Sequence, residues 1–166
     1  INNETMIYLK ELQLEKLDIW NSFYTDIFLE KGIKYLLENN KTLTDLSIGC
    51  SRFADEGLKH LSEELKINTT LKILDMSYCY LCNNNPIGIK YLYEAIKVNN
   101  CLTKLDLSKS VYEDSKLSNE LCKELGKILK INKSIKVLIL KENGIRTKSL
   151  KHLCDGLIMN NSLTDL

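Results

Sequence analysis

The feature of this sequence that most restricts its fold is a short apolar motif that recurs at nearly regular intervals along the chain. Leucine or another apolar residue fills its first, fourth and sixth positions, in the pattern LxxLxL. Complete copies begin at Leu43, Leu71, Leu102 and Ile135, and Leu163 opens another copy. Regular recurrence on this scale indicates a chain of stacked, similar units.

Near the N-terminus the motif fits two overlapping registers, which begin at Leu9 and at Leu14. We prefer the later register. It aligns residues 17–36 with residues 74–92 when one extra position is allowed. It also separates the first copy from the second by nearly the same interval as that between Leu43 and Leu71.

An amphipathic helix is predicted behind each motif. Leu58, Leu61 and Leu65 recur at intervals of three and four residues, which places them on one face of a helix. Similar spacings return behind the later motifs. Each unit therefore holds one short strand and one helix, and neither can bury its apolar face alone. Neighbouring units must stack into an α/β structure with a continuous core.

An asparagine stands three residues before each following motif, at Asn40, Asn68, Asn99, Asn132 and Asn160. We expect these residues to end the helices in the left-handed conformation, which Asn tolerates better than most other residues. Four of them also match the sequon for N-glycosylation. Because they keep step with the repeat, the structural interpretation is favoured over glycosylation.

The unit LxxLxLxx(N/C/S), followed by Gly-(Leu/Ile)-x-x-Leu-x-x-x-Leu-x-x-Asn, resembles the leucine-rich repeats of the intracellular ribonuclease-inhibitor subclass. The resemblance runs from about Leu14 onward. It implies a solenoid shaped as a horseshoe or arc, with a parallel β-sheet on the concave face and α-helices on the convex face. It also implies a small hydrogen-bonding residue at the ninth position of each unit, to satisfy backbone groups in the turn. This position holds Ser22, Ser51, Cys79, Ser110 and Asn143.

We expect a single domain over residues 1–166. Its repeats span roughly 14–42, 43–70, 71–101, 102–134 and 135–162, and a further repeat starts at 163–166. Because the chain begins without Met and stops on a new motif, we expect it to be part of a longer protein. The segments after Cys79 and Ser110 carry extra residues, which are either passive or extend a binding edge.

Charge and cysteine content limit the partners. The formal net charge is +1 and Lys and Glu are scattered along the chain, so we expect no nucleic acid and no membrane as a partner. We interpret the six cysteines as reduced thiols, which favours a cytoplasmic protein or one that a pathogen delivers into a host cell. We also expect the protein to be a monomer. Cys79 and Cys82 form only half of a zinc pattern, so we expect no metal and no cofactor.

Side chains between the apolar positions of each motif point away from the core, because residues alternate across a strand. They are the candidates for contact with a partner on the concave face. Exposed aromatic anchors concentrate binding energy in protein interfaces, and acidic side chains favour a basic partner surface. The candidate residues are Asp18, Trp20, Asp75, Tyr78, Asp106 and Lys109. Two alternatives stay open: Trp20 packs beneath the N-terminal segment as part of a cap, and the aspartates are ordinary solvated residues.

The sequence offers little for catalysis, and we expect no catalytic residue and no enzyme activity. His60 and His152 occupy matching helical positions, which places both on the convex helices rather than in a cleft. We therefore predict a protein-binding module, either a scaffold, an inhibitor, or the recognition region of a receptor or effector. The alternatives are a GTPase regulator of the Ran GTPase-activating type, for which Arg52 and Arg146 are the available arginines, and the recognition domain of a larger enzyme.

Overall fold

Strands and helices alternate along the chain in the computed structural model, which describes residues 13–21, 32–51, 53, 55–79, 81, 87–111 and 115–166. The strands are β1 (Lys16–Asp18), β2 (Asp45–Ser47), β3 (Ile73–Asp75), β4 (Lys104–Asp106) and β5 (Val137–Ile139). The helices are α2 (Lys34–Asn39), α3 (Asp55–Ile67), α4 (Ile87–Val98), α5 (Ser115–Ile131) and α6 (Thr147–Leu157). Within these ranges, no helix is both long and apolar enough to cross a bilayer.

The five strands form one parallel sheet in the order β1-β2-β3-β4-β5. The central leucines of the motif are paired across it: Leu17 with Leu46, Leu46 with Leu74, and so on to Leu138. The predicted α/β class and parallel sheet are confirmed. The pairing of Leu17 with Leu46 also agrees with the register that begins at Leu14.

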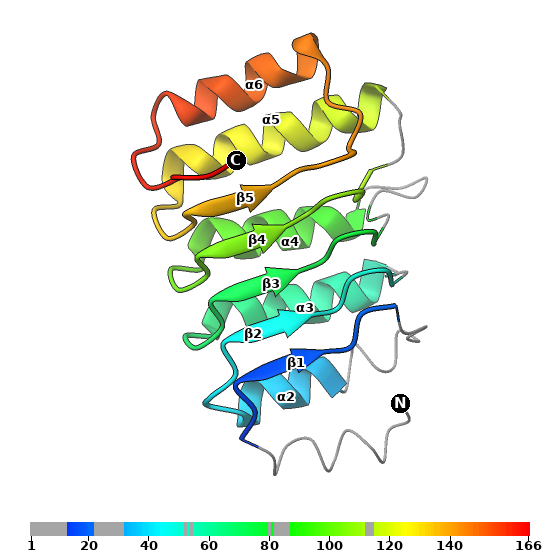
Figure 1. Ribbon diagram of the computed structural model, residues 1–166, viewed down its shortest axis with the longest axis vertical. Helices are drawn as coiled ribbons and strands as arrows, with labels where there is room; N and C mark the ends of the chain where they lie inside the picture. Colours follow the sequence, from blue (N-terminus) through cyan, green and yellow to red (C-terminus); the bar gives the residue numbers. More distant parts are fainter. Residues whose placement is uncertain are drawn as a thin grey trace.

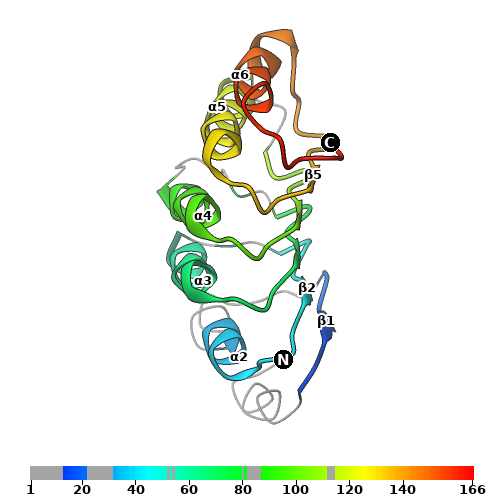
Figure 2. The ribbon, with the colours of Figure 1, turned by 90° about the vertical axis from the view of Figure 1, so that its left-hand side faces the viewer.

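The structure has two layers. Figure 1 shows the sheet in front of the helices, and Figure 2 shows the helices on one side and the strands on the other. Leu58, Leu61 and Leu65 of α3 are at most 1% exposed, as their spacing predicts. Leu46 and Leu74 meet this layer from the sheet and are equally buried. Each such leucine stabilises the fold by about 1.5–3 kcal/mol relative to an exposed one.

The left-handed conformation predicted for the repeat asparagines is wrong. Asn40 is extended, with φ −82° and ψ 120°, and none of the five asparagines is among the residues of positive φ in the described ranges. The non-glycine residues with positive φ lie instead in the turns that leave the strands. They are Asn21, Cys50, Tyr78, Lys109 and Glu142.

The repeat asparagines act through their side chains. The Oδ1 of Asn99 accepts hydrogen bonds from the backbone N–H groups of Cys101 (3.0 Å) and Leu102 (2.8 Å). Its Nδ2 donates to the carbonyl oxygens of Leu65 (2.7 Å) and Asn68 (3.3 Å) in the preceding unit. A buried amide that saturates backbone groups on both sides satisfies a structural requirement, which supports the structural interpretation of the sequons.

The prediction for the ninth position holds for some units only. The thiol of Cys79 donates to the carbonyl oxygen of Ile48 and Asn143 also bonds the backbone, whereas the buried hydroxyl of Ser110 has no hydrogen-bond partner among the described residues. The Oδ1 of Asn143 accepts hydrogen bonds from the N–H groups of Ser110 (2.8 Å) and Val111 (3.0 Å), and its Nδ2 donates to the carbonyl of Leu107 (2.8 Å). Ser22 lies outside the described residues, as does most of the segment after Cys79.

Candidate functional site

The sheet face opposite the helices carries two columns of side chains, since alternate residues of each short strand point the same way. One column comes from the first residue of each strand and the other from the last. The first contains Lys16, Asp45, Ile73, Lys104 and Val137, and the last contains Asp18, Ser47, Asp75, Asp106 and Ile139. We call the second one the aspartate column.

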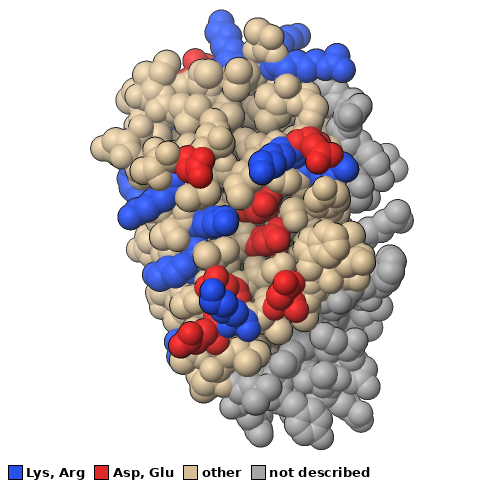
Figure 3. Space-filling view, in the orientation of Figure 1, with Lys and Arg blue, Asp and Glu red and all other residues tan. Residues whose placement is uncertain are grey.

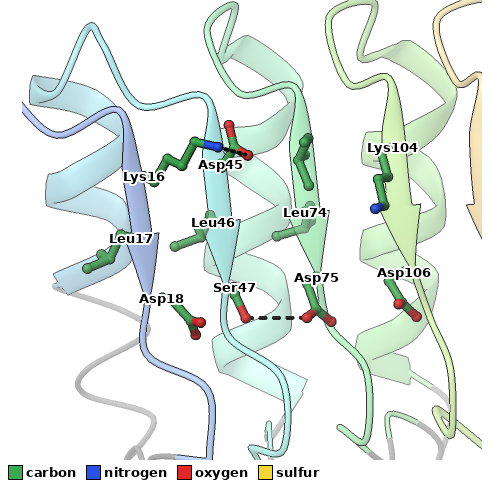
Figure 4. Close-up of a pocket in the computed structure, with 11 residues that line it drawn as sticks. Lys16, Leu17, Asp18, Asp45, Leu46, Ser47, Leu74, Asp75, Lys104 and Asp106 are labelled. Atoms are coloured by element: carbon green, nitrogen blue, oxygen red, sulfur yellow. Dashed lines mark hydrogen bonds and ion pairs between the residues drawn. The ribbon is translucent and has the colours of Figure 1, made fainter.

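A shallow hollow of about 310 Å³ lies over β1 to β4 between these columns. Figure 4 shows polar side chains from both columns around it. Lys16 Nζ lies 3.5 Å from the carboxylate of Asp45, and the hydroxyl of Ser47 donates to Asp75 Oδ2 over 3.3 Å. The hollow is open and mixed in charge, which suits an extended polar segment of a partner better than an enclosed small molecule.

The three aspartates of the column form hydrogen bonds within the turns that follow their strands. Oδ1 of Asp18, Asp75 and Asp106 accepts a hydrogen bond from the backbone N–H two residues later, at 3.0, 2.8 and 2.8 Å. This is the local bond that short polar side chains commonly make in turns. Part of their role is therefore to hold the turns that follow the strands.

Trp20 is 43% exposed. Its side chain extends from the end of β1 over Gly49, in the turn that follows β2. Its ring meets that of Tyr78 edge to face, with centroids 6.1 Å apart and planes at 74°. Its Nε1 donates to the hydroxyl of Ser77 at 3.5 Å. Gly49 lies beneath it, and a Cβ at Gly49 would come within 2.5 Å of Trp20 Cδ1. The glycine therefore makes room for the indole. The N-terminal segment proposed as a cap over Trp20 lies outside the described residues.

Tyr78, Lys109 and Glu142 continue from Trp20 along the turns. The Lys109 ammonium lies 4.8 Å from the centroid of the Tyr78 ring, within the range of a cation–π contact. The same ammonium is 2.8 Å from the carboxylate of Glu142. We call these four residues the aromatic row. It combines a flat apolar surface with a paired charge at one end.

The six residues predicted as a binding site thus fall into two adjacent groups. Asp18, Asp75 and Asp106 belong to the aspartate column, whereas Trp20, Tyr78 and Lys109 belong to the aromatic row. The first column, which includes Lys16, Asp45 and Lys104, was not among the predicted site residues. A signal for it was present, because a residue two positions before an exposed strand residue shares its face.

His60 and His152 lie on helices α3 and α6. His60 lies on α3 between the carboxylates of Glu56 and Glu63, at 3.4 and 3.7 Å. Among the described residues, no group of three or more His, Cys, Asp or Glu could hold a metal ion. Arg146 directly precedes α6, and Arg52 lies outside the described residues.

The comparisons with known proteins establish similarity of fold only. No family model and no curated protein sequence matches the chain. Among solved structures, it is similar to leiomodin-1 actin-binding site 2, with a TM-score of 0.66 and 20% identity over 94% of this chain and 89% of that one. It is also similar to the tropomodulin C-terminal domain from Caenorhabditis elegans, with a TM-score of 0.69 and 16% identity over 96% of this chain and 93% of that one.

These likenesses correct the resemblance drawn from the repeat pattern. The neighbours are a tropomodulin domain and a leiomodin domain, so the assignment to the ribonuclease-inhibitor subclass is wrong. The motifs that begin at Leu71, Leu102 and Ile135 already lie further apart than the short, constant repeat of that subclass. At this level of identity the likeness establishes the fold alone, a leucine-rich-repeat-like α/β fold of the tropomodulin and leiomodin kind.

Proposed function

We propose that this chain is a non-enzymatic protein-binding module that holds a partner against the exposed face of its parallel sheet. In this proposal the units within residues 14–162 form one leucine-rich-repeat solenoid, with the sheet on its concave side and the helices on its convex side. The in-register leucines and the repeated asparagine bonds between neighbouring units support the solenoid.

The observation that carries the proposal is the aromatic pair of the exposed Trp20 and the half-buried Tyr78 beside the aspartate column. A large aromatic ring left 43% exposed adds little to the core, but it is the side-chain type that anchors protein interfaces. Because Tyr78 and Ser77 already fix the orientation of Trp20, binding would lose little side-chain entropy.

Actin is the first partner to test, because the leiomodin-1 neighbour is named as an actin-binding site. Neither neighbour is named as a GTPase regulator, and no observation favours that alternative. The partner face proposed here combines acidic and aromatic side chains, so we expect it to contact a partner surface that carries basic and apolar groups.

The test is direct binding of purified actin, as monomer and as filament, to the wild-type chain and to a Trp20→Ala/Asp75→Asn/Tyr78→Asn variant. Asparagine at position 75 removes the charge but keeps an oxygen that can accept the bond from Ser77. Asparagine at position 78 tolerates the positive φ of 60° found there.

A matched control changes exposed helical residues of similar type, in a Tyr91→Asn/Glu63→Gln/Leu150→Ala variant. We expect the sheet-face variant to weaken binding at least tenfold, on the order of 1.4 kcal/mol, and the control to bind like the wild type. If actin does not bind, the same pair of variants is applied to proteins captured from cell lysate. A partner held equally by both variants would place the binding site away from the sheet face and refute the proposal.

A further inference from the structure

A row of exposed aliphatic side chains lies along the edge where the helices end and the chain turns into the next strand. The residue just before each of the last four repeat asparagines is apolar and largely exposed. These residues are Ile67 (71%), Val98 (61%), Ile131 (60%) and Met159 (64%). Side chains this exposed contribute little to the core, so the fold does not account for four of them in equivalent places.

The asparagine bonds fix the row in space. The side-chain amide of Asn99 reaches the carbonyl of Asn68 (3.3 Å), that of Asn132 reaches Asn99 (2.9 Å), and that of Asn160 reaches Asn132 (3.2 Å). Since these four residues lie side by side, the apolar residue that precedes each of them also has its neighbours in the adjacent units. The row follows the left-hand edge of the molecule in Figure 1.

Lysines accompany Ile67, Val98 and Ile131 in their own connecting segments, and Lys133 donates a hydrogen bond to the carbonyl oxygen of Met159. The segment 158–165 that carries Met159 has no lysine and contains Asp165. The three connecting segments 66–73, 97–104 and 130–137 contain seven lysines and no Asp or Glu. They are Lys66, Lys72, Lys97, Lys104, Lys130, Lys133 and Lys136. Within the part of the chain that the structure describes, only Lys97 of these seven forms a salt bridge, with Glu94 of its own helix. Figure 3 shows lysine side chains along this edge, with acidic ones near the middle of the sheet face and at the lower left.

We propose that this aliphatic and basic edge binds the surface of a bilayer that contains anionic lipids. The lysines would lie at the level of the lipid headgroups, each attracted to the negative surface, while Ile67, Val98, Ile131 and Met159 enter the boundary of the acyl chains. Of the residues of this edge, only Lys104 also belongs to the sheet face, in its first column, and the variants below leave Lys104 unchanged. A bilayer partner departs from the expectation, drawn from charges scattered along the sequence, that the chain has no membrane partner.

The chemistry of the row favours a bilayer over other anionic partners. Nucleic-acid surfaces commonly use aromatic side chains and arginine to stack on bases, whereas this edge offers aliphatic side chains and lysine. An amphipathic helix of another protein needs a groove to receive its apolar face. Here each unit projects one apolar residue, and the side chains form a ridge with lysines between them. A deformable lipid surface can accept such a ridge.

The test is co-sedimentation of the full chain with vesicles of phosphatidylcholine alone and with vesicles rich in phosphatidylserine. Two variants probe the edge: Ile67→Ser/Val98→Ser/Ile131→Ser removes aliphatic side chains, and Lys66→Gln/Lys130→Gln/Lys136→Gln removes charge. The matched control Lys90→Gln/Lys123→Gln/Lys151→Gln makes the same change of charge on exposed helical positions away from the edge.

We expect binding to the anionic vesicles only, with an affinity at least roughly tenfold lower for each edge variant and unchanged for the control. The sheet-face variant described above should bind vesicles like the wild type, which keeps the two proposals separable. Absence of binding to anionic vesicles overturns the inference. Equal loss in the control would assign binding to overall charge, and unchanged binding of the serine variant would remove the aliphatic row from the site. Either result also overturns it.

Discussion

Replacement of Asn99 by alanine tests whether the asparagine side chains hold neighbouring units together. The wild-type side chain is 5% exposed and bonds two backbone N–H groups of its own turn and two carbonyls of the preceding unit. Alanine would leave these groups without their partner, and the methyl group would not fill the space of the amide.

The magnitude follows from the two N–H groups, those of Cys101 and Leu102, which belong to buried residues. A buried donor that loses its partner costs about 1–3 kcal/mol. Partial entry of water would lower the sum, so we expect Asn99→Ala to reduce the free energy of unfolding by about 3 kcal/mol. This is a large fraction of the roughly 5–15 kcal/mol that holds a typical domain folded.

Urea denaturation followed by far-ultraviolet circular dichroism measures the effect. Asn100→Ala is the matched control, because it makes the same chemical change at the next residue, whose side chain is exposed. An unfolding free energy for Asn99→Ala within about 0.5 kcal/mol of the control would refute the structural role assigned to the repeat asparagines.

Three further predictions concern packing and ionisation. Gly156→Ala should lower stability by about 2–3 kcal/mol relative to the exposed control Asp155→Ala, because its Cβ would lie 2.3 Å from a backbone oxygen of α5; thermal unfolding measures this. Burial raises the pKa of Cys79 to about 12 and that of Cys122 to about 11, so a thiol reagent at mildly alkaline pH should modify them only after unfolding. Their contribution to stability should be present below the ordinary thiol value of 9.0 and be lost as pH rises through the raised values. Burial also raises the pKa of Glu64, so the neutral form of this side chain favours the folded state. Glu64→Gln should therefore stabilise the protein at neutral pH but not at acid pH, and the midpoints of urea denaturation at the two pH values measure this.

The strands were the part of the fold most accessible from the sequence. Leucines that alternate with polar residues must face one way, and copies of the motif in neighbouring units must meet in register. The pairings of Leu17 with Leu46 and of Leu46 with Leu74 follow from that pattern. The location of the aspartate column followed as well, because its members occupy the same position of each copy.

The conformation of the turns before and after the strands could not be predicted in the same way. Position 99 was recognised as special, but its conformation was assigned from the general preference of Asn, whereas the structure uses the amide as a bridge to the preceding unit. The left-handed positions carry residues such as Tyr78 and Lys109, which give no local signal for positive φ. The position of Trp20 beside Tyr78 depends on the small residue beneath the indole, Gly49, which only the packed turns reveal.

The distribution of charge on the folded surface also could not be predicted from the sequence. Lys66, Lys97 and Lys130 belong to different units and are far apart along the chain, and glutamates lie between them, so the sequence indicated a scattered mixture. Stacking brings one connecting segment of each unit to the same edge and leaves Glu94, Glu120 and Glu124 on the helices. A nearly neutral chain thereby acquires a basic edge.

The hydrogen bonds of the repeat asparagines between neighbouring units also affect how the protein unfolds. Asn132 donates to Ile96 and Asn99 of the preceding unit while it accepts from the N–H groups of Ser134 and Ile135 in its own. When one unit opens, its neighbour therefore loses hydrogen bonds as well as apolar contacts. Such nearest-neighbour coupling makes a linear array behave as a one-dimensional cooperative system. Order should spread through it from unit to adjacent unit, and a defect in the middle should weaken both halves.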